Sequence, residues 1–171
     1  MMTQLGKLEA LYPQRLIDRL TKDFLKTKRK IKINNEEFLI LNTCFLILYL
    51  SLHLFHHNFT GAFRYDFLDK VIRKNKLSIN KWKDIALIIN KYQLQNFIYP
   101  VFFFLKKYYQ TLIPKNFLNQ IKPNFYTIFT LLFTQHLHKI NIFNDEPRLK
   151  AGIKRFYIFL FYPPLLFGKK Y

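Results

Sequence analysis

A run of 26 residues without a charged side chain, residues 38–63, limits the fold of this chain more than any other feature. Such a run has to be buried in a protein core or in a bilayer, since about 20 apolar residues can span a membrane. Polar side chains interrupt the run, and several of them would need hydrogen-bond partners inside lipid. They are Asn42, Thr43, Ser51, His53, His56, His57 and Asn58. We therefore expect a core helix here, with a membrane helix at residues 38–55 as the alternative.

The composition favours one helical domain over residues 1–171. A chain of 171 residues with 50% hydrophobic content is long enough and apolar enough to bury a core. Glycine occurs only four times. No segment shows the alternation of apolar and polar residues between turn residues that is typical of strands. These observations predict an all-α, single-domain bundle of about six to eight helices.

Apolar periodicity and capping residues divide the chain into eight predicted helices. We expect Asn34 or Asn35 to cap the second helix and Pro100 to lie in the first turn of the fifth. The fourth helix, which begins at Ser78 or Asn80, places Trp82, Ile85, Ala86 and Ile89 on its core face. The predicted helices span residues 13–26, 34–57, 62–75, 78–92, 96–109, 114–121, 125–139 and 144–161.

Histidines form a polar seam on the helix at the end of the charge-free run. On a helix of about 3.6 residues per turn, five polar or aromatic side chains lie within roughly a third of the circumference. They are Asn42, Tyr49, His53, His56 and His57. A spacing of three or four residues would let two histidines share a metal ion. The third ligand is not determined by the sequence, with Asp66, Asp69 and His136 as the candidates, so we expect core histidines and no metal site.

A glycine turn and a helix with two charged residues follow the histidines. Arg64 could enter the polar seam and pair there with Asp69 or with a phosphate group. The interpretation that we prefer is an ion pair that ties two helices together. The candidate residues of the seam are therefore His53, His57, Arg64 and Asp69.

Several kinds of catalytic site are not supported by the sequence. Cys44 lies among apolar residues with no base nearby, and Ser51 has no glycine elbow around it. The four glycines are isolated, so neither a P-loop nor a dinucleotide fingerprint can be formed. We predict no catalytic residue in this chain.

The cellular compartment is inferred from cysteine use and from the N-terminus. The single cysteine, Cys44, is expected to be a buried structural thiol, which fits a reducing compartment. The first residues lack the basic and then apolar order of a secretory signal. We expect a cytoplasmic protein, with membrane association as the alternative.

The formal net charge of +18 raises the question of polyanion binding. Most of the charge is dispersed, and the densest run, residues 26–32 (KTKRKIK), has the composition of a solvated helix end and loop. Abundant Lys, Asn, Ile, Phe and Tyr also suggest an AT-rich coding sequence, which adds lysine without a functional cause. The charge alone is therefore a poor indicator of nucleic-acid binding.

Three segments of the chain resemble a known family. They are FLILYLSLHLFHHNFTGAFRYDFLDKVI, INKWKDIALIINKY and the tripeptide at residues 112–114. Together they resemble the helical C-terminal region of a bacterial polymerase-beta-type nucleotidyltransferase family, over residues 13–123. His53 and His57 match its His-x-x-x-His helix end, Arg64 and Asp69 match the helix that follows, and residues 80–82 loosely match an Asp-Trp helix start. Residues 124–171 would add further helices.

The resemblance implies an enzyme part that this chain lacks. Family members carry a Gly-Ser turn followed by two carboxylates, which hold divalent ions and a nucleoside triphosphate. No glycine in this chain is followed by serine, and no Asp-x-Asp or Asp-x-Glu pair occurs. The resemblance thus implies a truncated gene, one half of a split enzyme or a decayed relative. Alone it would have no cofactor and no transferase activity, and Mg²⁺ and nucleotide would require a separate catalytic core.

Two other classes of function remain open from the sequence. The first is a small basic membrane protein, in which residues 38–55 lie in or across the bilayer and residues 26–32 meet anionic headgroups. The second is a helical module that binds nucleic acid.

Overall fold

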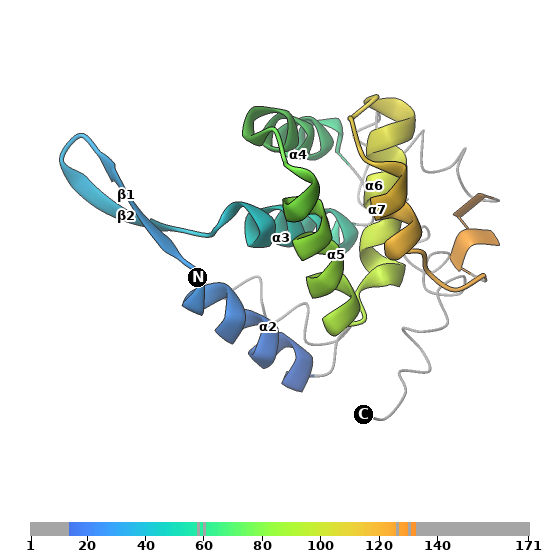
Figure 1. Cartoon of the computed structure of the whole chain (residues 1–171), viewed down its shortest axis with the longest axis horizontal. Helices are drawn as coiled ribbons and strands as arrows, with labels where there is room; N and C mark the ends of the chain where they lie inside the picture. Colours follow the sequence, from blue (N-terminus) through green and yellow to red (C-terminus); the bar gives the residue numbers. More distant parts are fainter. Residues whose placement is uncertain (1–13, 58, 60, 126, 130, 133–171) are drawn as a thin grey trace, which may run out of the picture.

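A computed structural model describes residues 14–57, 59, 61–125, 127–129, 131 and 132. Within these residues, helices form a bundle and two strands form a hairpin that projects from it (Figure 1). The elements are α2 (Gln14–Lys26), β1 (Arg29–Ile33), β2 (Glu36–Ile40), α3 (Thr43–His56), α4 (Ala62–Asn75), α5 (Ile79–Lys91), α6 (Gln95–Tyr108) and α7 (Lys115–Gln120). The prediction of an all-α, single-domain bundle of six to eight helices is confirmed.

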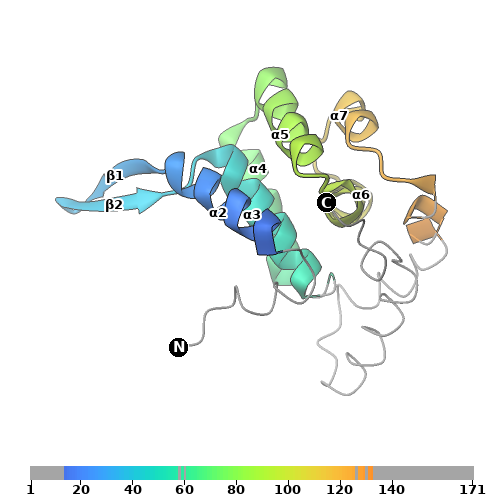
Figure 2. The same ribbon diagram turned by 90° about the horizontal axis from the view of Figure 1, so that it is seen from below.

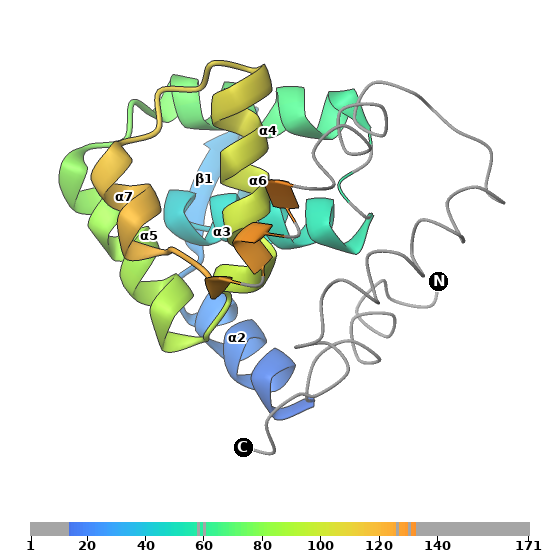
Figure 3. The same ribbon diagram turned by 90° about the vertical axis from the view of Figure 1, so that its right-hand side faces the viewer.

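Helix α3 is the centre of the core. It packs against α4, α5 and α6, and Figure 3 shows α6 crossing in front of it. Ile47, Leu48 and Leu54 are almost completely buried, as expected for a helix that carries no charged side chain. The capping prediction for this helix was wrong in position: Asn42 is the N-cap, and its side chain accepts a hydrogen bond from the Phe45 backbone N–H at 3.0 Å.

The charge-free run does not form a membrane helix. Residues 38–40 belong to β2, and α3 has 14 residues. A helix of that length is about 21 Å long, whereas the hydrocarbon core of a bilayer is about 30 Å thick. In the part of the chain that the structure describes, no helix has the length and apolar content needed to cross a membrane. The alternative of a spanning helix at residues 38–55 is therefore not supported, whereas the expected core helix is α3.

An aromatic cluster joins α5, α6 and α7. The Trp82 ring lies 6.0 Å from Phe102 and 4.6 Å from Phe117, centroid to centroid, and the two phenylalanine rings are 5.0 Å apart. The predicted core face of α5 is confirmed, because Trp82, Ile85, Ala86 and Ile89 are its buried residues. Ser78 is the N-cap, and its hydroxyl accepts a hydrogen bond from the Lys81 backbone N–H.

Helix α2 is fastened to the bundle by one aromatic contact and one polar cluster. The Phe24 ring meets the edge of Phe45 at 4.9 Å between centroids. The Asp23 carboxylate accepts a hydrogen bond from the Tyr92 hydroxyl and lies 2.9 Å from the Lys91 Nζ. The hydrogen bond from Tyr92, followed by that from Lys91, lowers the pKa of Asp23. Burial raises the pKa of Tyr92. The acidic side chain of Asp23 is thus turned toward α5.

The β-hairpin replaces the predicted start of the second helix. Asn34 and Asn35 have φ values of 49° and 68°, the left-handed conformation that a type I′ hairpin turn needs at both central residues. The strands pair antiparallel, with Ile31 opposite Phe38. The prediction that Asn34 or Asn35 caps a helix was therefore wrong. The basic run, predicted as a helix end and loop, supplies the end of α2, a short loop and most of β1, and figures 1 and 2 show the hairpin pointing away from the helices.

One further expectation differs from the structure. Pro100 lies in the sixth position of α6 rather than in its first turn, because the helix begins at Gln95. In α4, Phe63 and Phe67 are 63% and 54% exposed, while Tyr65 and Leu68 are buried. The helix predicted at residues 125–139 is helical where it is described, up to residue 132. The predicted helix at 144–161 lies outside the described residues, as does most of the added region 124–171.

Candidate functional site

His53 and His57 lie together at the C-terminal end of α3. Their rings are 4.5 Å apart between centroids and meet edge to face, and Tyr49 stacks on His53 at 6.2 Å. The His57 backbone N–H donates to the His53 carbonyl at 3.1 Å, so the two residues are one helical turn apart. Both are half-buried and Tyr49 is exposed, so this part of the seam reaches the surface. The side chain of His56 lies outside the described part.

A tight turn connects the histidines to α4. Phe59 has a φ of 59° and is fully buried, and its N–H donates to the Leu54 carbonyl at 2.9 Å. Gly61 has a φ of 92° and a ψ of 100°, a conformation open almost only to glycine. The guanidinium of Arg64 folds back over this glycine and over the Phe63 ring, 4.3 Å from its centroid. The turn therefore sets the direction of Arg64 at the start of α4.

Replacing Gly61 with alanine is expected to destabilise the protein by about 1–3 kcal/mol, because the backbone conformation is strained for any residue with a Cβ. A Cβ would also overlap the Arg64 guanidinium, but the end of that flexible side chain can move away. Urea denaturation followed by circular dichroism measures the loss. Adding Arg64→Ala to Gly61→Ala should restore less than half of it, and full recovery would show that the overlap, not the backbone, causes the strain.

Asp69 lies on α4, and its side chain contacts the segment that joins α6 to α7. It is 8% exposed. Its carboxylate accepts hydrogen bonds from the Thr111 hydroxyl at 2.6 Å and from the Arg73 Nε at 2.7 Å. Arg73 also donates to the Tyr109 carbonyl at 2.9 Å. Asp69 and Arg73 thus tie α4 to residues 109–111.

Tyr109 completes the contact between α4 and this segment. Its hydroxyl donates to the Ala62 carbonyl at 3.0 Å, and its ring stacks on Tyr65 at 5.7 Å between centroids. Burial raises the pKa of the Tyr109 hydroxyl, and the nearby carboxylates of Asp66 and Asp69 add to this effect. The neutral hydroxyl is therefore the form that the fold favours.

The structure brings together only part of the predicted seam. His53 and His57 are in contact, but Arg64 and Asp69 are five positions apart on α4, which is about 140° around the helix. The predicted ion pair between Arg64 and Asp69 is replaced by the pair of Asp69 with Arg73. The expected ion pair between two helices is not formed, since Asp69 and Arg73 both lie on α4. Hydrogen bonds of Asp69 with Thr111 and of Arg73 with the Tyr109 carbonyl link α4 to the segment after α6.

Arg73 and Thr111 were missed in the sequence. The spacing of four residues between Asp69 and Arg73 is a signal for a helical ion pair and could have identified the arginine. Nothing in the sequence indicates Thr111, which is 42 residues from Asp69 along the chain. Such a partner is defined only by where the chain after α6 lies against α4.

The other residues considered as metal ligands or nucleophiles include Asp66, His136 and Cys44. Asp66 pairs with Lys70 at 2.6 Å on the surface of α4, and His136 lies outside the described residues. Among the side chains that the structure describes, no three His, Cys, Asp or Glu residues are grouped to hold a metal ion. Cys44 is half-buried rather than fully buried, its Sγ lies 4.0 Å from the Lys81 carbonyl, and burial raises its pKa.

Comparisons with protein-family models, with curated proteins and with solved structures found no match.

Proposed function

We propose that this chain is the helical part of a polymerase-beta-type nucleotidyltransferase and that it packs beside a separate catalytic core. Two of the three segments that carry the family resemblance coincide with the consecutive helices α3, α4 and α5, and α4 and α5 each pack against α3. The observation that carries the proposal is the contact of His53 with His57 at the end of α3, directly before the turn into α4. This contact forms the His-x-x-x-His feature that the resemblance requires at a helix end.

In this proposal the chain supplies surface and orientation, while the core supplies the chemistry. Paired carboxylates on the core would hold Mg²⁺ and the nucleoside triphosphate. The half-buried imidazoles of His53 and His57 would face the substrate, because they lie where α3 ends at the surface. Arg64, which follows the Gly61 turn, would approach the substrate from the start of α4. Asp69 would keep α4 in place through Arg73 and Thr111. Such a protein works in the cytoplasm, which fits a lone cysteine that forms no internal disulfide.

Co-expression with the product of the reading frame before Met1 tests the proposal. We expect that frame to encode a Gly-Ser turn with two nearby carboxylates, and its product to co-purify with the tagged chain. The complex should transfer a labelled nucleotide in the presence of Mg²⁺, whereas the chain alone should neither bind Mg-ATP in calorimetry nor label a substrate. Absence of such a frame, failure to co-purify, or activity of the chain alone would each contradict the proposal.

A further inference from the structure

Exposed basic side chains run along α2 and continue into β1. All seven are exposed, and they are referred to below as the cationic track: Arg19, Lys22, Lys26, Lys28, Arg29, Lys30 and Lys32. In α2, the three cations fall within about 60° of one another around the helix. The opposite side of α2 carries Phe24, which packs against α3. The track is therefore the outward face of an element whose inward face is fastened to the bundle.

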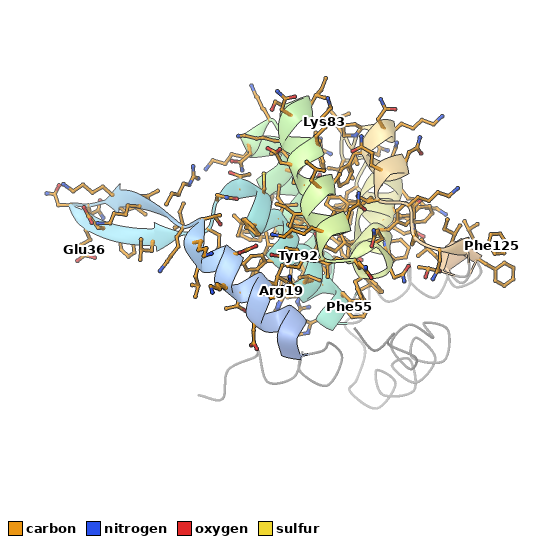
Figure 4. The ribbon with its side chains drawn as sticks, turned by 60° about the horizontal axis from the view of Figure 1, so that its bottom comes forward. Arg19, Glu36, Phe55, Lys83, Tyr92 and Phe125 are labelled. Carbon is orange, nitrogen blue, oxygen red and sulfur yellow. The ribbon has the colours of Figure 1, made fainter. Side chains whose placement is uncertain are left out.

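Helix α2 has two acidic side chains: Asp18, one helical turn before Lys22, and Asp23, which is bound by α5. Asp23 is engaged by Tyr92 and Lys91 of α5, which leaves Asp18 as the exposed acid of this helix. On the hairpin, Glu37 lies 2.8 Å from the Nζ of Lys30, and Figure 4 shows Glu36 at the tip, far from Arg19 on α2. In the described part of the chain, Lys30 is the only member of the track in a salt bridge. In the middle of the track, Lys26, Lys28 and Arg29 form no salt bridge with a described residue, so their charges can bind an anionic partner.

The hairpin separates its lysines from most of its apolar side chains. Residues paired across an antiparallel ladder share a face, and successive residues alternate between faces. Lys30 and Lys32 lie on the face with Glu37 and Leu39. Ile31 and Phe38 lie on the other face, together with Arg29 at the base of the hairpin. An arm that inserts into a membrane needs a face that is apolar up to its tip. On this hairpin, the face of Ile31 and Phe38 also carries Glu36, whose carboxylate at the tip would have to enter the bilayer first (Figure 4). The arrangement on this hairpin is better suited to phosphates that approach one face.

We propose that the cationic track binds the phosphate backbone of duplex nucleic acid, without reading its sequence. A two-stranded ribbon fits the major groove, which is about 12 Å wide, and α2 can then follow the adjacent backbone. Phosphate contacts from Lys and Arg give affinity and position, and no base contact is required. Single strands are usually held by stacking on several aromatic rings, whereas Phe38 is the one aromatic residue of β1 and β2. This proposal does not depend on a separate catalytic core.

Fluorescence anisotropy of a labelled duplex of ~20 base pairs, titrated with the full chain at several salt concentrations, tests the proposal. With about five phosphate contacts, log K should fall with log salt with a slope of roughly −4 to −5. The triple variant Lys26→Ser, Lys28→Ser, Arg29→Ser should reduce the magnitude of the slope by about 3 and weaken binding at least ~10-fold at moderate salt. The single variant Lys28→Ser should reduce it by about 1 and provides the same readout if the triple variant fails to fold.

A matched control removes the same charge on the far side of the bundle. Lys83, Lys106 and Lys115 are exposed on α5, α6 and α7, and their triple serine variant has the same net charge as the track variant. We expect it to retain the slope within about 1 unit. Equal losses from both triple variants would show that overall charge alone drives binding and would overturn the proposal. So would binding to phosphatidylserine vesicles with no binding to the duplex, or tighter binding to single-stranded DNA than to the duplex.

Discussion

Truncation of Phe102 to alanine is expected to lower the free energy of unfolding by about 3–5 kcal/mol. Phe102 is fully buried, and its ring fills the space between Trp82 on α5 and Phe117 on α7. The substitution loses the free energy gained by burying the ring away from water. It also leaves a cavity, which α5, α6 and α7 cannot close without moving. Urea denaturation followed by Trp82 fluorescence and by circular dichroism would measure the loss as a lower midpoint with an unchanged m-value.

An exposed phenylalanine provides the control for this cavity. Phe67 lies on α4 and is 54% exposed, so Phe67→Ala removes the same atoms from a site that solvent already reaches. We expect a change of no more than about 0.5 kcal/mol. Similar losses for Phe102→Ala and Phe67→Ala would contradict the packing of α5, α6 and α7 described above.

Replacement of Asp69 by alanine is expected to cost about 2–3 kcal/mol, because it leaves the Thr111 hydroxyl and one Arg73 N–H without their acceptor. Thr111 is 3% exposed, so water cannot easily take the place of the carboxylate. The same variant should increase amide hydrogen exchange at residues 109–111, which Arg73 would no longer hold against α4. Chemical denaturation and exchange measured by mass spectrometry would show the two effects.

The same helix contains a matched control for Asp69. Asp66 also pairs with a cation four residues later, Lys70, but the two side chains are 50% and 71% exposed. Asp66→Ala should cost no more than about 0.5 kcal/mol, since an exposed helical ion pair contributes little. A double-mutant cycle of Asp69→Ala with Thr111→Val should give a coupling of about 1 kcal/mol or more. Additive effects in that cycle would mean that the hydrogen bond to Thr111 does not contribute to stability.

The parts of the fold that were predicted correctly depend on local periodicity. In α5, the apolar side chains of Trp82, Ile85, Ala86 and Ile89 recur at helical spacing, and Ser78 has the side chain that an N-cap needs. The absence of charge in residues 38–63 likewise required that α3 be buried, whatever packs around it. Both signals lie within one element, so they can be read without knowing its neighbours.

In the hairpin, the local sequence was compatible with two structures, a helix start and a turn. Asn34 and Asn35 are suitable both for a helix cap and for the central positions of a type I′ turn. Glu36 and Glu37 fit the first turn of a helix, but Asn42 at the start of the apolar run provides a second cap, and the helix begins there. The five residues before the pair then form β1 against β2, a pairing between residues up to 11 positions apart in sequence.

In the candidate site, too, some features follow from local sequence and others depend on tertiary contacts. The sequence by itself determined that His53 and His57 share a helical face and that Gly61 precedes a new helix, because these depend on spacing and on the conformational freedom of glycine. Only the tertiary structure decided that Asp69 binds Thr111 and that Asp23 binds Tyr92. Thr111 is 42 residues from Asp69 along the chain, and Tyr92 is 69 residues from Asp23. The packing of the helices, and not local spacing, therefore brings each pair together.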